Sequence, residues 1–215
     1  MNRADLLNEL IGEGYLTTPE IIDAFREIDR ADFVPESERA LAYENIALPI
    51  GYGSTISQPL TVAFMFEKLA PKTGDKVLDI GSGSGWTSAL LAEVTRDKRQ
   101  ATEGNGQVIG IEIISELVER AEKVVAEKYS HLAKRIRFIT ANAERGFADE
   151  APFDGIIAAA ALSDEIPAAW KEQLAISGRI VAPVGNAIHL VVREAENTYK
   201  EEVFPGFVFV PFQYT

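Results

Sequence analysis

Hydrophobic residues repeat at helical spacing near the start of this chain and later gather into short runs. The first helix is expected over residues 6–11, where the leucines form one stripe. A second helix is expected to begin at Pro19, with Thr18 as its cap and an apolar stripe from 21 to 28. An irregular stretch rich in turn-forming residues follows, and a third helix is predicted over residues 60–70.

Beyond residue 75, short apolar runs alternate with amphipathic helices. The runs have the length of buried strands: KVLDI (76–80), QVIGIE (107–112), IRFIT (136–140), GIIAA (155–159) and GRIVAPVG (178–185). The helices between them are WTSALLAEV (86–94), SELVERAEKVVAEKY (115–129) and PAAWKEQL (167–174). Strands that alternate with helices predict a parallel sheet that is covered on both faces.

The end of the chain departs from this alternation. AIHLVVRE (187–194), YKEEVFP (199–205) and GFVFVPF (206–212) have no helix between them and are predicted as consecutive antiparallel strands at one edge. The fold class is therefore α/β, with a doubly wound, mostly parallel, Rossmann-like sheet. We expect one domain over residues 1–215, made of an N-terminal helical cap with a loop (1–58) and an α/β core (59–215). Residues 95–107 are expected to form a solvated surface insertion.

Charge and composition narrow the range of functions. The chain has 215 residues with a net charge of −12, which disfavours nucleic acid and anionic membrane surfaces as partners. No apolar run reaches the roughly 20 residues that span a bilayer. Cysteine is absent, which excludes disulfides and thiolate chemistry and fits a cytoplasmic location. No metal site is predicted, and the sequence does not indicate an oligomeric state.

The most informative motif is VLDIGSGSGW, where a strand enters a glycine-rich turn that opens a helix. Glycines in such a turn let the backbone approach a ligand, and free N–H groups at the helix start face it. A tight turn without a ligand is the less favoured alternative. A dinucleotide fingerprint is also disfavoured, because Trp86 stands beside the last glycine. Asp79 would repel a pyrophosphate but suits a cationic or hydrogen-bond-donating ligand. The predicted ligand-binding residues here are Asp79, Gly81, Ser82, Gly83 and Gly85.

Polar residues also follow the next two predicted strands. Glu112 ends the second strand, where a carboxylate can accept both hydroxyls of a ribose, although strand ends are often simply acidic and solvated. Asn142 and Ala143 follow the third strand; the Asn142 amide can pair with an adenine edge or equally form a turn. Because open α/β sheets bind ligands at the carboxyl ends of their strands, these positions together favour S-adenosylmethionine as the cofactor.

Several motifs resemble the protein-L-isoaspartate O-methyltransferases. The likeness runs from RADFVP (30–35) to VFVPF (208–212), and LPIGYGSTISQP (48–59) is its most specific part. The resemblance implies a methyltransferase that modifies the α-carboxylate of L-isoaspartyl residues in damaged proteins or peptides. It also implies that the loop around TISQP lies over the site of methyl transfer, with Ser57 and Thr55 as catalytic residues. It further implies that backbone groups of 53–58, 158–162 and 209–211 hold the misplaced main chain of the substrate. From the residues alone, Ser57 would rather be interpreted as the cap of the helix that starts near Pro59.

This chain departs from the family pattern at a few positions. Ala141-Asn142-Ala143 stands where the family usually has Gly-Asp-Gly, and Tyr43-Glu44-Asn45 where it has Tyr-Glu-Asp. The AAAALSDEIP segment is one residue longer than usual near Ser163 and Asp164. Two alternatives therefore remain open: a methyltransferase acting on another carboxylate or small molecule, and a non-catalytic relative that binds the cofactor.

Overall fold

The computed structural model describes residues 1–97 and 106–213 of the chain, and the predicted insertion at 95–107 falls largely outside them. A sheet of seven strands forms the centre, in the order β5-β4-β3-β6-β7-β8-β9. Its strands are β3 (Lys76–Ile80), β4 (Gln107–Glu112), β5 (Ile136–Thr140), β6 (Phe153–Ala158), β7 (Leu174–Val184), β8 (Ala187–Ala195) and β9 (Thr198–Pro205). The first five strands pair in parallel and the last two antiparallel. The predicted doubly wound sheet with an antiparallel edge is confirmed.

Most helices pack on the sheet through one apolar stripe, whereas α4 (Trp86–Thr95) is buried along nearly its whole length. The others are α1 (Arg3–Gly12), α2 (Pro19–Glu27), α3 (Pro59–Leu69), α5 (Ser115–Lys128) and α6 (Ala168–Glu172), with short 3-10 turns η1 (Arg30–Phe33), η2 (Glu36–Leu41) and η3 (Ala148–Glu150). One cluster of buried side chains joins α1 through α5 to one face of the sheet. A second cluster, with Trp170 of α6 at 0% exposure, covers the other face. The division of the chain after residue 58 stays a prediction.

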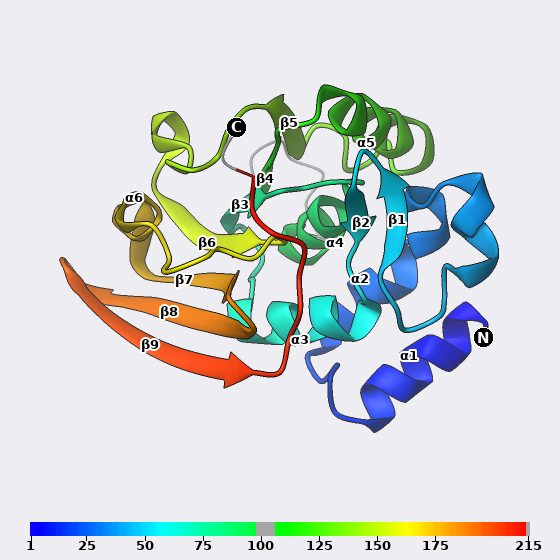
Figure 1. Cartoon of the computed structure of the whole chain (residues 1–215), viewed down its shortest axis with the longest axis horizontal. Helices are drawn as coiled ribbons and strands as arrows, with labels where there is room; N and C mark the ends of the chain where they lie inside the picture. The colour runs from blue at the N-terminus through cyan, green and yellow to red at the C-terminus, as the bar shows by residue number, and fades with distance from the viewer. Residues whose placement is uncertain (98–105, 214–215) are drawn as a thin grey trace.

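The predicted third antiparallel strand at 206–212 is wrong. After β9 the chain turns at Gly206, whose φ is 100°, and leaves the sheet. It then returns across the molecule, as the red trace in Figure 1 shows, and meets the segment after β6 at a single bridge between Ala161 and Pro211. Phe207 anchors this return by packing on Phe64 of α3, with ring centroids 4.9 Å apart. Tertiary packing on a helix therefore overrides the local strand pattern.

Two predicted helix caps are also corrected. Thr18 precedes α2, but its hydroxyl donates to the Glu67 carboxylate at 2.7 Å and makes no cap bond, because a charged acceptor from α3 is the stronger partner. Ser57 does not cap α3 either. The N–H of Leu60 in the first turn of that helix donates at 3.0 Å to the side-chain oxygen of Asn45, a residue distant in sequence.

A short hairpin stands beside the main sheet. It consists of β1 (Leu48–Gly51) and β2 (Ser54–Ile56), which pair antiparallel and form a sheet of their own. An Arg120 side chain from α5 donates to the carbonyl of Ile50 and ties the hairpin to the core. No helix of the described ranges, 1–97 and 106–213, is long and apolar enough to cross a membrane.

Candidate active site at the carboxyl edge of the sheet

The glycine-rich turn between β3 and α4 forms the floor of the site. Gly81, Gly83 and Gly85 all have positive φ, at 73°, 52° and 84°, which side chains other than glycine rarely adopt. The N–H groups of Gly81 and Ser82 both donate to the carbonyl of Ile111 on β4, at 2.8 and 3.0 Å. These bonds fix the turn against the neighbouring strand, so its shape is set before any ligand binds.

Glu112, at the end of β4, connects this turn to the next one. One carboxylate oxygen accepts from the Gly83 N–H at 2.9 Å, and the other accepts from the N–H groups of Ile113 and Ile114 at 2.8 and 3.1 Å. The side chain is 7% exposed and borders the cavity. A carboxylate has about four acceptor sites, so it can hold these three N–H groups and still accept from a ligand hydroxyl.

Asp79 lies beneath the glycine turn and is fully buried. Burial raises the pKa of its carboxyl to about 7; the Ser88 hydroxyl, which donates to it at 2.6 Å, acts in the opposite direction, and the charge of Glu112 raises the pKa further. Its second oxygen and the Ser82 hydroxyl have no hydrogen-bond partner among the described residues. A cation bound above the turn would therefore favour the ionised form of Asp79.

The residues after β5 form the far wall of the site. Asn142 and Ala143 both line the cavity. The side-chain oxygen of Asn142 accepts from the Glu144 N–H at 2.8 Å, so the turn that was one of its two predicted roles is present. The Asn142 side chain is thereby held in one orientation at the cavity wall.

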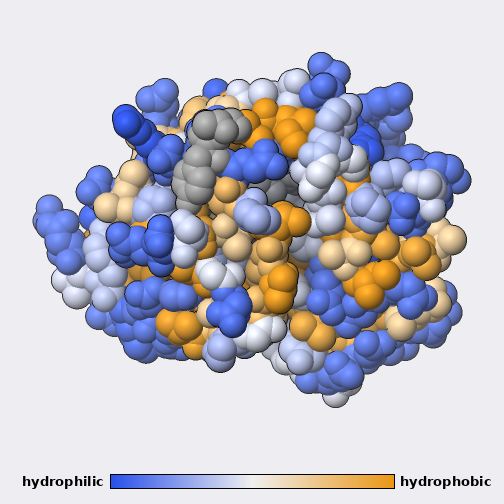
Figure 2. Space-filling view, in the orientation of Figure 1, coloured by the Kyte–Doolittle hydropathy of each residue, from blue (hydrophilic) through white to orange (hydrophobic). Residues whose placement is uncertain are grey.

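The hairpin and the returning C-terminal segment close over these turns. They enclose a cavity of about 250 Å³, whose wall residues come from each of the segments described above. Gly53, Ser54 and Thr55 line it from the hairpin, and Val210, Pro211, Phe212 and Gln213 from the C-terminal segment. Figure 2 shows this side of the molecule with hydrophilic residues around its rim and hydrophobic ones gathered toward its centre. Tyr52 at the hairpin tip and Val208 are 58% and 90% exposed.

The predicted site residues separate into two groups. Those that line the cavity are Thr55, Gly81, Gly83, Glu112, Asn142 and Ala143. Those that do not line the cavity are Ser57, which is half-buried, and the buried Asp79, Ser82 and Gly85; their contact with a ligand stays a prediction. Gly85 is buried against α5 and β5, where a Cβ would lie 2.7 Å from the Ala121 Cβ.

Sequence reasoning missed several apolar wall residues. Ile80, Ile111, Ile113 and Ile114 line the cavity but have the pattern of ordinary core residues. The local pattern of Val210–Gln213 predicts a strand, and only the family resemblance placed FVP (209–211) near the substrate. Only its position after two antiparallel strands, with Gly206 and Pro211 as breaks, could have indicated a segment that leaves the sheet.

The cavity suits a nucleoside with a cationic side group. Positive-φ glycines allow close approach, the Glu112 carboxylate can accept from ribose hydroxyls, and the isoleucines provide an apolar surface for a base. The Glu112 carboxylate lies beside the turn, and Asp79 adds a second negative charge when a bound cation favours its ionised form. In the part of the chain that the structure describes, no group of His, Cys, Asp and Glu residues could hold a metal ion.

A family model and curated relatives match nearly the whole of this chain. The family model "Protein-L-isoaspartate(D-aspartate) O-methyltransferase (PCMT)" matches residues 1–214. A protein-L-isoaspartate O-methyltransferase of Hyperthermus butylicus is 37% identical over 213 residues, covering 97% of this chain and 87% of that protein. Another, from Ignicoccus hospitalis, is 35% identical over 215 residues, covering 97% and 96%.

A solved structure has the same fold over the whole chain. It is a Plasmodium falciparum protein described as a beta-aspartate methyltransferase in complex with S-adenosyl-L-homocysteine. The two structures superpose with a TM-score of 0.88 at 22% identity, covering 100% of both chains. The N-terminal helices, the hairpin and the C-terminal return therefore belong to the shared architecture.

Proposed function

Since this chain belongs to the protein-L-isoaspartate(D-aspartate) O-methyltransferase family, we propose that the cavity at the carboxyl edge of its sheet is where the reaction takes place. The enzyme transfers a methyl group from S-adenosylmethionine to the α-carboxylate of L-isoaspartyl residues in damaged proteins or peptides. The observation that carries the proposal is the meeting of the Glu112-bound glycine turn, Thr55 and Val210 in one cavity.

Each wall of the cavity has a separate task in this reaction. Gly81 and Gly83 provide the approach for the cofactor, Glu112 accepts from its ribose, and Asn142 and Ala143 border its adenine. Asp79, Ser82 and Gly85 are also predicted to contact the cofactor. When bound, S-adenosylmethionine supplies a methyl group on a positively charged sulfur.

The acceptor needs little chemical assistance from the protein. An ionised carboxylate is already a nucleophile, so no general base is required, and the protein has to align the reacting atoms and exclude water. The hairpin residues 53–55 and the C-terminal residues 210–213 line the cavity, and we propose that they perform this task. Their backbone groups suit a substrate defined by its misplaced main chain, because that defect occurs next to any side chain.

The first test compares two peptides of one sequence, with isoaspartate or aspartate at the same position. We expect methyl transfer from labelled cofactor to the isoaspartyl peptide and little to its aspartyl twin, because only the former carries a free α-carboxylate on a side-chain-linked backbone. Peptide methylation is measured by the transferred label. Equal labelling would favour another acceptor, and no labelling with the cofactor demonstrably bound would favour a non-catalytic relative.

Ser57 is proposed to act on the acceptor. Ser57→Ala should lower kcat about threefold to tenfold while leaving cofactor affinity within twofold, since a hydrogen bond contributes roughly 0.5–1.5 kcal/mol. The exposed Ser37 provides a matched control, and Ser37→Ala should change neither quantity. Steady-state kinetics and calorimetry on both variants would decide, and an unchanged kcat in Ser57→Ala would remove Ser57 from the catalytic residues.

Two further expectations belong to this proposal. We propose a cytoplasmic location and no nucleic acid partner. The absence of cysteine and the net charge of −12 support them.

A further inference from the structure

Arg30 is a buried charged residue that the reaction described above does not use. It is 3% exposed and lies in η1, at the start of the RADFVP motif. Its guanidinium donates to three backbone carbonyls, those of Ala42 at 2.7 Å, Ile46 at 2.9 Å and Ser57 at 3.1 Å. The three carbonyls belong to the segments that lead into the hairpin and out of it. Arg30 therefore joins both ends of the hairpin to one rigid group.

The positive charge of Arg30 is stabilised by carbonyl groups and an aromatic ring and not by a carboxylate. Among the described residues no carboxylate forms an ion pair with it, and besides the carbonyls it faces the ring of Trp86, 5.4 Å from the ring centroid. Trp86 is the first residue of α4, directly after Gly85 of the glycine turn. Burial lowers the pKa of Arg30 to about 10, so the side chain stays charged at neutral pH. One side chain thus contacts the hairpin ends and the helix behind the cofactor turn.

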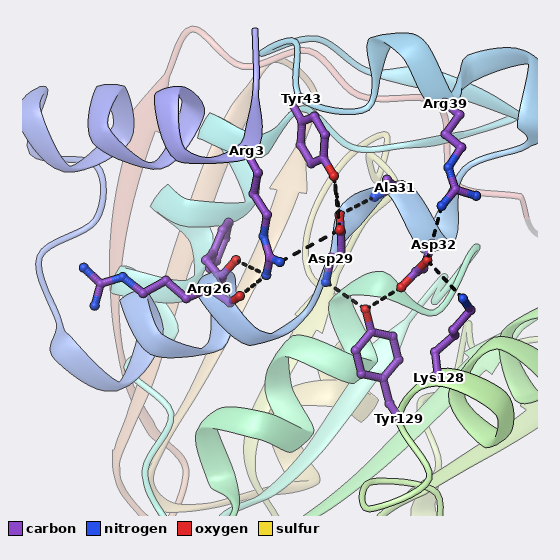
Figure 3. A network of polar contacts seen from close by, with 10 residues as sticks. Arg3, Arg26, Asp29, Ala31, Asp32, Arg39, Tyr43, Lys128 and Tyr129 are labelled. Carbon is purple, nitrogen blue, oxygen red and sulfur yellow. Dashed lines mark hydrogen bonds and ion pairs between the residues drawn. The ribbon is translucent and has the colours of Figure 1, made fainter.

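The backbone that carries Arg30 is itself fixed by a polar network, which Figure 3 shows. On one side, the Asp29 carboxylate accepts from the Ala31 N–H at 2.9 Å and from the Tyr43 hydroxyl at 3.0 Å. On the other, the Tyr129 hydroxyl from α5 accepts from the Asp29 N–H at 2.8 Å and donates to Asp32 at 2.9 Å. Hydrogen bonds therefore hold both sequence neighbours of Arg30, and they fix the backbone position from which its side chain extends.

We infer that Arg30 is a positioning residue for methyl transfer, which sets the place of the Ser57 peptide relative to the glycine turn. The inference rests on the proposed role of the Ser57 loop at the acceptor. A planar guanidinium can serve several carbonyls in fixed directions and stack on a ring, whereas a lysine ammonium is a point charge without that geometry. Arg30 does not line the cavity, so its effect on the reaction passes through the groups that it contacts, the carbonyl of Ser57 and the ring of Trp86.

The test compares Arg30→Lys with a matched variant, Arg193→Lys. Arg193 also donates to two backbone carbonyls, those of Glu172 and Leu174, and also has an Nε without a partner, but it lies on β8 outside the cavity wall. In Arg30→Lys we expect kcat for the isoaspartyl peptide to fall about tenfold to hundredfold, as for small misplacements of a reacting group. Affinity for S-adenosyl-L-homocysteine should stay within threefold. Arg193→Lys should lower the melting temperature by less than Arg30→Lys does, because Arg193 is only half-buried, and it should keep kcat.

Chemical rescue distinguishes a positioning role of Arg30 from a general loss of stability. If Arg30→Lys is unfolded at the assay temperature, the parent enzyme and both lysine variants are assayed at a lower temperature at which all three are folded. Under the same conditions Arg30→Ala is assayed with guanidinium ion at concentrations that leave the parent enzyme folded, and a recovery of kcat of several fold that methylammonium does not produce is the expected result. A kcat loss equal to that of Arg193→Lys, or no recovery specific to guanidinium, would overturn the positioning role. Failure of the proposed function is seen separately, because the parent enzyme would then not discriminate the isoaspartyl peptide and Ser57→Ala would leave its kcat unchanged.

Discussion

Replacing Glu112 by alanine is expected to lower the affinity for S-adenosyl-L-homocysteine about hundredfold. The carboxylate is proposed to accept from the ribose, and a hydrogen bond to a charged acceptor contributes roughly 1.5–3 kcal/mol, while a factor of one hundred corresponds to about 2.7 kcal/mol. The loss should also extend to the protein itself, since the N–H groups of Gly83, Ile113 and Ile114 lose their acceptor. Calorimetry for binding and thermal unfolding for stability would measure the two effects.

A second substitution shows why a carboxylate is needed at this position. In Glu112→Gln the amide nitrogen must face either the Gly83 N–H or the two N–H groups of Ile113 and Ile114. In both orientations a donor then faces a donor and a hydrogen bond is lost. Glutamine is therefore expected to weaken binding nearly as much as alanine. The exposed Glu116 in the first turn of α5 is the matched control, and Glu116→Ala should leave the affinity unchanged. Unchanged affinity in Glu112→Ala would contradict the ribose contact.

The parts of the structure that depend on local pattern could be predicted from the sequence. The strand at 76–80 has the bounds expected from its apolar run, and so has the strand at 107–112. Both strands are short and buried, and each is followed by a segment of helical pattern that packs on the sheet, so local preference and fold agree. Because parallel strands bring their carboxyl ends to one edge, the meeting of the glycine turn with Glu112 and Asn142 also followed from the sequence.

The parts that depend on distant contacts could not be predicted. Nothing near Thr18 indicates that Glu67, from another helix, takes its hydroxyl, and nothing near Leu60 indicates that Asn45 caps its helix. Asn45 also shows how a departure from the family pattern fits this chain. Its amide nitrogen lies 3.5 Å from the Glu9 carboxylate, where an aspartate would place two negative charges together.

The glycines of the turn are a further case in which distant contacts matter. The motif predicts one role for all of them, whereas the structure gives Gly81 and Gly85 different surroundings. Gly81 lines the cavity, and a Cβ added to it meets nothing within 4 Å. A Cβ on Gly85 would lie 2.7 Å from the Ala121 Cβ and 3.1 Å from the Phe138 ring. The requirement for glycine at 81 is therefore one of backbone conformation and ligand approach, whereas at 85 it is also one of packing between α4, α5 and β5.

Gly85→Ala is accordingly expected to destabilise the protein by about 2–5 kcal/mol, the sum of roughly 1–2 for a left-handed alanine and 1–3 for overpacking. Gly81→Ala should lower the free energy of unfolding only by the roughly 1–2 kcal/mol of a left-handed alanine. It should lower cofactor affinity at least tenfold, because its methyl group enters the space over the turn. Gly74 is the matched control: its φ is 91°, a Cβ there also meets nothing within 4 Å, and it lies outside the cavity wall. Gly74→Ala should therefore show the conformational cost with normal affinity. Chemical denaturation and calorimetry on the three variants would separate the terms, and equal stability of Gly85→Ala and Gly74→Ala would contradict the packing argument.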